Sequence, residues 1–271
     1  MKISFMTWAC PDWTIDQIVD AAVRYGYDGV EPRVEADQRH GIELESTPAE
    51  RQAARRKFED AGVAISCLAT SRTYALADAA EREASIARTI EYAHLAADLG
   101  CPYLRVFGGP TPEGMTAADA QRHVADSLAS IGPAAASLGV TACLETHDSY
   151  CDADWCASTV RLAATPGLGI VWDIMHPFRV GQSIEHAFEA VKGLVRHCHA
   201  HDAIVGPSGE FDMRLMGEGL IPHDEAIALL VRAGFEGHIS GEYIDFLPAD
   251  DLLPHEAEVL RAYITVAQSA S

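Results

Sequence analysis

The 271-residue sequence lacks asparagine altogether and contains no run of 18 apolar residues. Without asparagine there is no acceptor for N-glycosylation, and without a long apolar run we expect no transmembrane helix. The first residues, MKISFMTWACPDW, also lack the long apolar core of a signal peptide. These absences predict a cytoplasmic protein without a membrane partner.

The seven cysteines are odd in number and never occur with CxxC spacing. A disulfide framework or a zinc ribbon is therefore not expected, and we interpret the cysteines as reduced thiols, several of them in the core. The sequence also lacks the P-loop pattern, the GxSxG nucleophile elbow and a GxGxxG turn after the first expected strand. These gaps argue against phosphate-binding NTPases, α/β-hydrolases and dinucleotide-binding folds.

Basic residues are scarce: 20 Lys and Arg face 40 Asp and Glu, a net charge of 20 − 40 = −20. Such a surface repels nucleic acid and anionic lipid, so we expect neither as a partner. Lysine accounts for only three of the basic residues, and none lies at the carboxyl end of an expected strand. A Schiff-base mechanism is therefore poorly supported. The remaining expectation is a protein that acts on a small molecule.

Short apolar runs alternate with longer amphipathic segments along the whole chain. Helix starts are indicated at Thr14, Thr47, Thr116 and Ser183, and glycines such as Gly26 mark helix ends shortly before strands. Eight strands alternating with helices predict an α/β fold, a single-domain (β/α)8 TIM barrel over residues 1–271. The expected strands are 3–7, 29–33, 63–69, 103–107, 140–145, 168–173, 195–201 and 238–243.

Acidic residues and histidines gather where the last four expected strands end, in LETHD, WDIMHP, RHCHAHD and SGEY. In a barrel these ends are neighbours on one rim, so two Glu, one Asp and at least one His converge. This mixed set suits one divalent ion, such as Mn²⁺, Mg²⁺, Co²⁺ or Zn²⁺, which would also relieve repulsion among the carboxylates. Each position alone has a structural alternative, a helix cap for Asp173 or a packing role for a strand histidine.

These motifs resemble the xylose isomerase-like barrel family, which includes sugar epimerases, inosose isomerases and dehydratases, hydroxypyruvate isomerase and endonuclease IV. The resemblance covers nearly the whole chain, from PDWTIDQIVDAAVRYGYDGVEPR through YLRVFGG to MGEGLIPHDEAIALLVRAGFEGHISGEY. It implies the barrel fold, one bound metal ion, Mn²⁺ foremost, and a homo-oligomer. By resemblance to the epimerase branch, the metal ligands are Glu145, Asp173, His199 and Glu242.

The resemblance also implies roles around the metal. Glu145 and Glu242 correspond to the acid/base pair, and His176 to a histidine that contacts substrate. The family's H-x-K-D motif falls on residues 199–202, where His201 stands in place of lysine. His147 and Arg214 are further candidates for substrate contact, with residues 203–213 as a lid; a loop contact or a surface ion pair is the alternative for each.

The predicted function is a divalent-metal-dependent isomerase or epimerase that acts on a small keto-sugar or keto-cyclitol through an enediolate. The alternative is a lyase with the same first step: a dehydratase, β-eliminase or decarboxylase. An endonuclease IV-like activity fits less well, because GVEPR and CLATSR lack the extra histidine ligands of that branch. A non-catalytic binding barrel is the fourth interpretation. No cluster of Lys and Arg suggests a phosphate site, so we expect a non-phosphorylated substrate.

Overall fold

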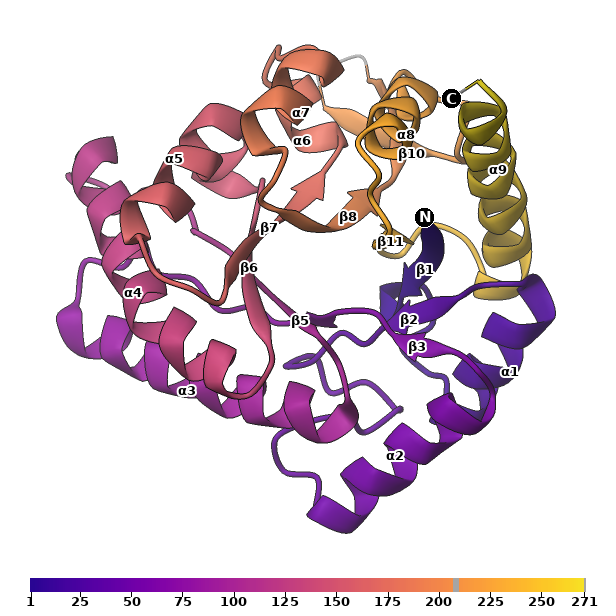
Figure 1. Cartoon of the computed structure of the whole chain (residues 1–271), viewed down its shortest axis with the longest axis horizontal. Coiled ribbons are helices and arrows are strands. Elements are labelled where there is room, and N and C mark those ends of the chain that lie inside the picture. Colours follow the sequence, from indigo (N-terminus) through magenta and orange to yellow (C-terminus); the bar gives the residue numbers. More distant parts are fainter. Residues whose placement is uncertain (207–209, 271) are drawn as a thin grey trace.

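The structure, a computed structural model, describes residues 1–206 and 210–270. Its main sheet has nine strands in the order β3-β2-β1-β11-β8-β7-β6-β5-β4, and every pair is parallel. Figure 1 shows the strands around a central axis, with the helices outside them. The strands are β1 (Lys2–Met6), β2 (Gly29–Glu31), β3 (Ala64–Ile65), β4 (Leu68–Ala69), β5 (Tyr103–Val106), β6 (Thr141–Glu145), β7 (Leu168–Asp173), β8 (Val195–Ala200) and β11 (His238–Gly241).

The sheet closes where the two outermost strands follow each other in the chain. The expected strand 63–69 is split into β3 and β4, with Ser66 and Cys67 between them. A parallel bridge joins Arg33 to Ala69, and the Ala69 amide donates to the Pro32 carbonyl at 3.0 Å. Counting β3 and β4 as one barrel strand gives the eight that the sequence predicted, so the (β/α)8 barrel is confirmed.

The helices begin and end where their capping residues predict. At four helix starts, the side-chain oxygen of the capping residue accepts a hydrogen bond from the backbone N–H three positions later. These residues are Thr14, Thr47, Thr116 and Ser183, and the first two form complete capping boxes. Gly26 ends its helix in the left-handed conformation, with φ of 76°. The helices are α1 (Ile15–Tyr25), α2 (Pro48–Asp60), α3 (Ala79–Leu99), α4 (Ala117–Ser137), α5 (Ala153–Ala163), α6 (Met175–Arg179), α7 (Ile184–Val191), α8 (His223–Arg232) and α9 (Ala249–Ser269).

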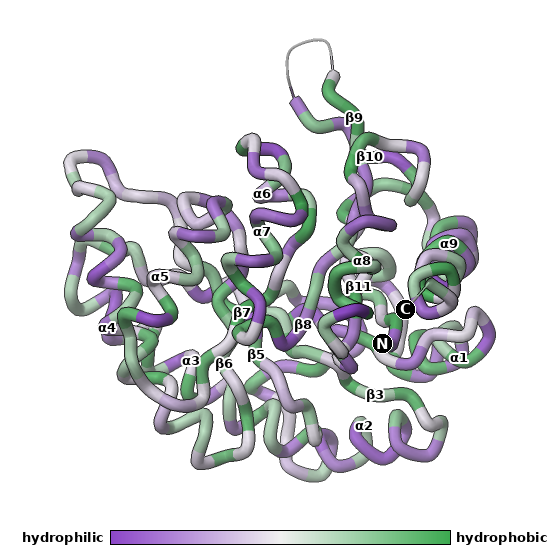
Figure 2. Tube along the Cα trace, turned by 45° about the horizontal axis from the view of Figure 1, so that its top comes forward, coloured by the Kyte–Doolittle hydropathy of each residue, from purple (hydrophilic) through white to green (hydrophobic). Residues whose placement is uncertain are grey.

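One element differs from the sequence-based expectation of a lid loop over residues 203–213. An antiparallel hairpin of β9 (Asp202–Val205) and β10 (Phe211–Arg214) follows β8 directly, pairing Asp202 with Arg214. Its tip, residues 207–209, lies outside the described residues. Figure 2 shows the hairpin rising above the barrel mouth. The two strands are four residues each, too short for their alternation to stand out in the sequence.

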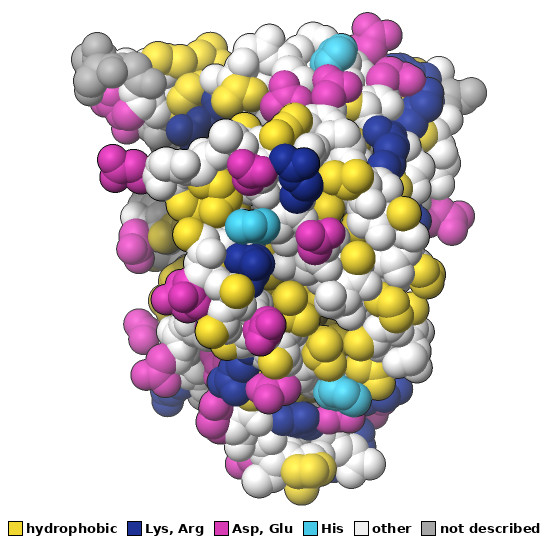
Figure 3. All heavy atoms as spheres, turned by 90° about the vertical axis from the view of Figure 1, so that its left-hand side faces the viewer, with side chains coloured by type: hydrophobic (Ala, Val, Ile, Leu, Met, Phe, Trp, Pro, Cys, Tyr) yellow, Lys and Arg dark blue, Asp and Glu magenta, His cyan; other side chains and the backbone are white. Residues whose placement is uncertain are grey.

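The barrel strands separate an apolar layer from a polar interior. Residues such as Ile3, Phe5 and Trp172 belong to the hydrophobic core, whereas alternate residues such as Ser4 are buried and polar. Ionisable side chains buried in this interior are stabilised by contacts with one another. The outer face over α3, α4 and α5 instead mixes acidic, basic and apolar side chains (Figure 3). Within the described residues, no helix is long and apolar enough to span a membrane.

A tight contact between α4 and the turn before β7 predicts an unusual effect of adding one methyl group. A Cβ at Gly132 would lie 2.5 Å from the Pro166 carbonyl oxygen and 2.6 Å from Thr165. Alanine normally favours a helix over glycine by about 1 kcal/mol, but overpacking costs about 1–3 kcal/mol. We therefore expect Gly132→Ala to lower the free energy of unfolding in urea denaturation. Ser130→Ala, exposed on the same helix, should stay within about 0.5 kcal/mol of wild type; a stabilised Gly132→Ala would contradict the contact.

A second stability prediction concerns His40, a buried residue in the loop that follows β2. Its Nδ1 accepts the Ile42 amide at 2.9 Å, so the ring is neutral in the folded protein. Burial lowers the pKa of His40 to about 4, whereas an unfolded chain titrates near pH 6.5. Between these values the unfolded chain binds more protons, so acidification from about pH 6.5 to 4 costs up to about 1.4 kcal/mol per pH unit.

Urea denaturation across this pH range tests the assignment. His40→Gln should reduce the pH slope of the unfolding free energy, since glutamine does not titrate. His186→Gln is the matched control, because that side chain is 58% exposed. A slope that is unchanged in His40→Gln would show that His40 does not contribute to acid lability.

Candidate metal centre

Four neighbouring strands bring the predicted ligands to one level of the barrel. Glu145 ends β6, Asp173 ends β7, His199 lies in β8, and Glu242 follows β11 directly. Strand register sets Asp173 beside His199, and His199 beside Ser240 of β11. One donor atom from each of the four residues lies within 4.8 Å of the others. The structure thus brings all four together, although Glu145 and Glu242 are 97 positions apart in the chain.

His199 lies at the centre of this group. Its Nδ1 atom is 2.9 Å from Glu145 Oε1 and 3.3 Å from Glu242 Oε2. Glu145, Asp173 and His199 are fully buried, and Glu242 is 9% exposed. Three carboxylates and one imidazole nitrogen make a mixed oxygen and nitrogen donor set that suits a divalent cation.

The two carboxylate oxygens of Asp173 make different contacts. Its Oδ1 accepts the backbone amides of Met175 and His176 at the start of α6, at 2.9 and 3.1 Å. Its Oδ2 contacts His201 Nε2 at 2.9 Å. The helix-capping alternative and the ligand interpretation of Asp173 are therefore compatible, because capping fixes the orientation of the carboxylate that faces the donor group.

The electrostatics of the cluster show that it attracts positive charge. Burial opposes protonation of His199, but Glu31, Glu145 and Glu242 outweigh it and raise the pKa of His199 well above its usual value. Burial would raise the pKa of Glu242, but His199 and Arg105 outweigh it and lower that pKa to about 2. Carboxylates that stay ionised in a buried site need a nearby cation. A divalent ion fits this requirement as well as the donor chemistry.

Two ionisable residues of this site were not predicted from the sequence. Arg105 of β5 is 1% exposed, lies 3.1 Å from Glu145 Oε2, and places its guanidinium 4.0 Å from the centre of the Phe107 ring. Glu31 of β2 is fully buried and contacts both His197 and His199. The sequence carries a signal for both residues: each is a charged residue within a short apolar run, YLRVF or GVE. A charged residue that is buried with such a run needs a partner of opposite charge.

A cavity of about 270 Å³ opens beside the donor group. The rings of His147 and His176 are 4.4 Å apart, and those of His176 and His201 are 5.7 Å apart. All three predicted substrate-binding histidines thus face one space. Arg214, at the base of the hairpin, instead contacts the Met213 carbonyl and Asp212. The cavity is lined by His147, His176, His201, Met213, Glu242 and Ile244.

Comparison with known proteins places this barrel in a family. The sequence model described as "Xylose isomerase-like TIM barrel" matches residues 19–263. The chain belongs to the xylose isomerase-like TIM barrel family. The matched range includes all four donor residues and the whole cavity, so the site lies within the part of the chain that defines membership. No curated protein matches the sequence.

Solved structures share the fold at low sequence identity. The IOLI protein, in a crystal structure with a zinc atom, is 18% identical, has a TM-score of 0.85, and the match covers 98% of this chain and 99% of that one. L-ribulose 3-epimerase is 15% identical with a TM-score of 0.82, covering 99% and 96%. The probable 3-DHS dehydratase AsbF from Bacillus anthracis is 18% identical with a TM-score of 0.78, covering 96% and 99%.

One position distinguishes this chain from the H-x-K-D motif of the family. His201 occupies the lysine position, and its ring reaches Asp173 rather than solvent. Burial disfavours the charged form, but Asp173 outweighs it and raises the pKa of His201. A lysine would bring a longer side chain that ends in an ammonium group, whereas His201 presents an imidazole to the cavity.

Proposed function

We propose that this protein is a divalent-metal-dependent isomerase or epimerase of a small keto-sugar or keto-cyclitol. The observation that carries the proposal is the convergence of three carboxylates and His199 Nδ1 beside a cavity lined by three histidines. Glu145, Asp173, His199 and Glu242 would hold the ion, with Mn²⁺ as the first candidate and Mg²⁺, Co²⁺ or Zn²⁺ as alternatives. When bound, such an ion polarises a substrate carbonyl and acidifies the neighbouring C–H.

The two glutamates are suited to the proton transfers on either side of that carbon. Glu242 lines the cavity, and the buried Glu145 contacts the same His199 Nδ1 while its second oxygen pairs with Arg105. A proton removed by one carboxylate and returned to the opposite face of the same carbon inverts its configuration. Return to the adjacent carbon exchanges ketose and aldose.

The cavity favours a small, uncharged substrate. Its lining contains three imidazoles, Glu242 and two apolar side chains, with no Lys or Arg among the described residues that face it. Imidazole nitrogens can donate to or accept from sugar hydroxyls, while Met213 and Ile244 offer apolar contact to C–H groups. A volume of about 270 Å³ is at the small end for ligand cavities, which fits a monosaccharide or cyclitol without phosphate.

A lyase acting on a related keto-polyol or sugar acid is the second candidate. It would share the first proton removal and then expel a neighbouring hydroxyl. The similarity in fold to the probable 3-DHS dehydratase is the reason to assay for elimination products as well.

Two measurements test the proposal. Protein purified without chelators or metal-binding tags should contain about one divalent ion per chain by mass spectrometry. Incubated with ketoses and inososes in D₂O, it should exchange a substrate C–H for deuterium, and the exchange should stop after metal removal. An ultraviolet-absorbing enone among the products would favour the lyase. A protein that neither contains nor takes up Mn²⁺, Mg²⁺, Co²⁺ or Zn²⁺ would overturn both candidates and leave a binding barrel.

A further inference from the structure

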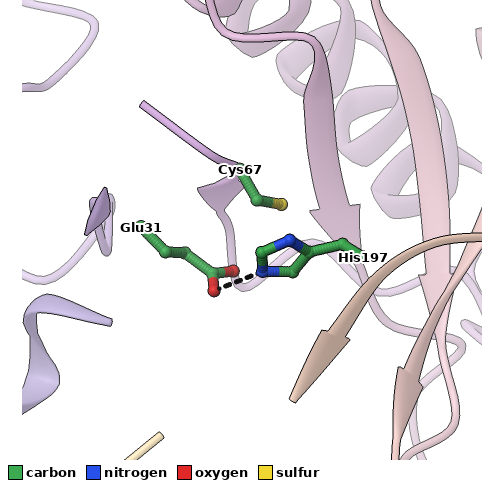
Figure 4. A group of neighbouring side chains, drawn as sticks. All are labelled: Glu31, Cys67 and His197. Carbon is green, nitrogen blue, oxygen red and sulfur yellow. Dashed lines mark hydrogen bonds and ion pairs between the residues drawn. The ribbon is translucent and has the colours of Figure 1, made fainter. Parts of the chain in front are cut away.

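Glu31 connects two histidines of β8 from the opposite side of the barrel. Its Oε2 atom is 2.8 Å from His197 Nε2, and its Oε1 atom is 3.0 Å from His199 Nε2. All three side chains are fully buried. Figure 4 shows the carboxylate of Glu31 directed at the ring of His197, with the Cys67 thiol nearby.

These contacts determine which nitrogen of His199 is available to a cation. A carboxylate can only accept hydrogen bonds, so both histidines carry their proton on Nε2 where they face Glu31. Nδ1, which lies 2.9 Å from Glu145 and 3.3 Å from Glu242, is then the nitrogen left for a cation that enters the donor group. The opposite tautomer would place an N–H at the donor group and leave a lone pair against the carboxylate.

We propose that Glu31 is a positioning residue that holds His199 in the Nε2–H tautomer and directs Nδ1 toward the metal. His197 supports Glu31 by donating to its second oxygen. The inference rests on the metal centre proposed above, and it assigns to the barrel interior a role that none of the four ligands performs. An outer carboxylate of this kind typically contributes 10–100-fold to metal affinity.

The same region offers one competing arrangement. Donor atoms of Glu31, Cys67 and His197 lie within 4.8 Å of one another and resemble a second metal site. Both oxygens of Glu31 already accept from imidazoles, and the nitrogen of His197 that faces Glu31 is the donor in that contact. His197 Nδ1 is buried without a hydrogen-bond partner among the described residues and is the nitrogen left for such an ion. A Glu31 oxygen would still have to give up a hydrogen bond to an imidazole to complete that group, so the geometry favours positioning over ligation.

The test compares Glu31→Gln with Cys67→Ala in the full-length protein. Zn²⁺ and Mn²⁺ affinities are measured by competition with a chelator, together with the number of ions per chain. Glutamine keeps the size of Glu31 but cannot accept from both histidines with both heavy atoms, so we expect affinity to fall about 10–100-fold. Cys67→Ala, equally buried, should bind one ion per chain with affinity within about twofold of wild type.

Each outcome is distinguishable. Unchanged affinity in Glu31→Gln overturns the positioning role while leaving the metal centre intact. Two ions per wild-type chain, with one lost in both variants, would establish the second metal site instead. If Glu31→Gln does not fold, nitrogen NMR of the zinc-loaded wild-type protein decides. Hydrogen on Nε2 of His199 would support the positioning role, and hydrogen on Nδ1 would overturn it. A wild-type chain that binds no metal would overturn the proposed function as well.

Discussion

Replacing Glu242 with glutamine is expected to lower kcat/KM by about 10²–10⁴-fold, the usual contribution of a positioned acid or base. The amide keeps the shape of the side chain but cannot take a proton. Glu242 lines the cavity and is the most exposed of the four donors, so the substrate carbon can approach it. The measurement is the rate of deuterium incorporation into the substrate at saturating metal.

Two controls separate proton transfer from other losses. Glu236→Gln, an exposed glutamate in the turn before β11, should retain wild-type activity. Metal content of Glu242→Gln must be measured in parallel, because the substitution also removes a charged ligand. Full metal occupancy with near wild-type exchange would exclude Glu242 as the proton-transfer group and direct attention to Glu145.

The second large effect is expected on stability, from replacing Arg105 with methionine. Arg105 is 1% exposed and pairs with the fully buried carboxylate of Glu145. Removing one partner of a buried pair leaves an uncompensated charge, which typically costs about 3–5 kcal/mol. Urea denaturation in the presence of a chelator should show this loss. Added Mn²⁺ should recover part of it, because a bound dication compensates the same carboxylates and stabilises the folded state.

Arg55→Met provides the matched comparison. Its ion pair with Glu59 joins two exposed side chains, and such pairs contribute about 0–1 kcal/mol. Similar losses in the two variants would mean that the interior of the barrel is well hydrated and that Arg105 does not neutralise Glu145. A loss confined to Arg105→Met would support the charge balance inferred for the site.

The sequence predicted the parts of the structure that depend on local signals. Helix caps such as Thr14 use a side chain and a backbone amide three residues apart, so their pattern is visible in the chain. Glu145 ends a parallel strand and Glu242 directly follows one, and the barrel topology alone brings such ends to one rim. Whether these residues act as ligands remains a prediction for the experiments above.

The missed features depend on contacts between distant segments. Glu31 meets His199 across 168 positions, and Arg105 of β5 meets Glu145 of the neighbouring strand β6. Spacing along the chain does not identify either partner, because the register between the strands must be known first. Asp202 is a related case: its carboxylate accepts the amides of Gly217 and Gly219, which connects the HAHD and MGEG motifs.

The way the barrel closes has a consequence for the order of folding. β11 lies between β1 and β8, and its pairing with β1 joins Lys2 to His238. During synthesis these edges of β1 and β8 therefore stay unpaired until residues 238–241 have left the ribosome. Such edges are prone to intermolecular pairing. Glu242 immediately follows β11, so the nascent chain completes its last barrel strand and its donor group in the same step.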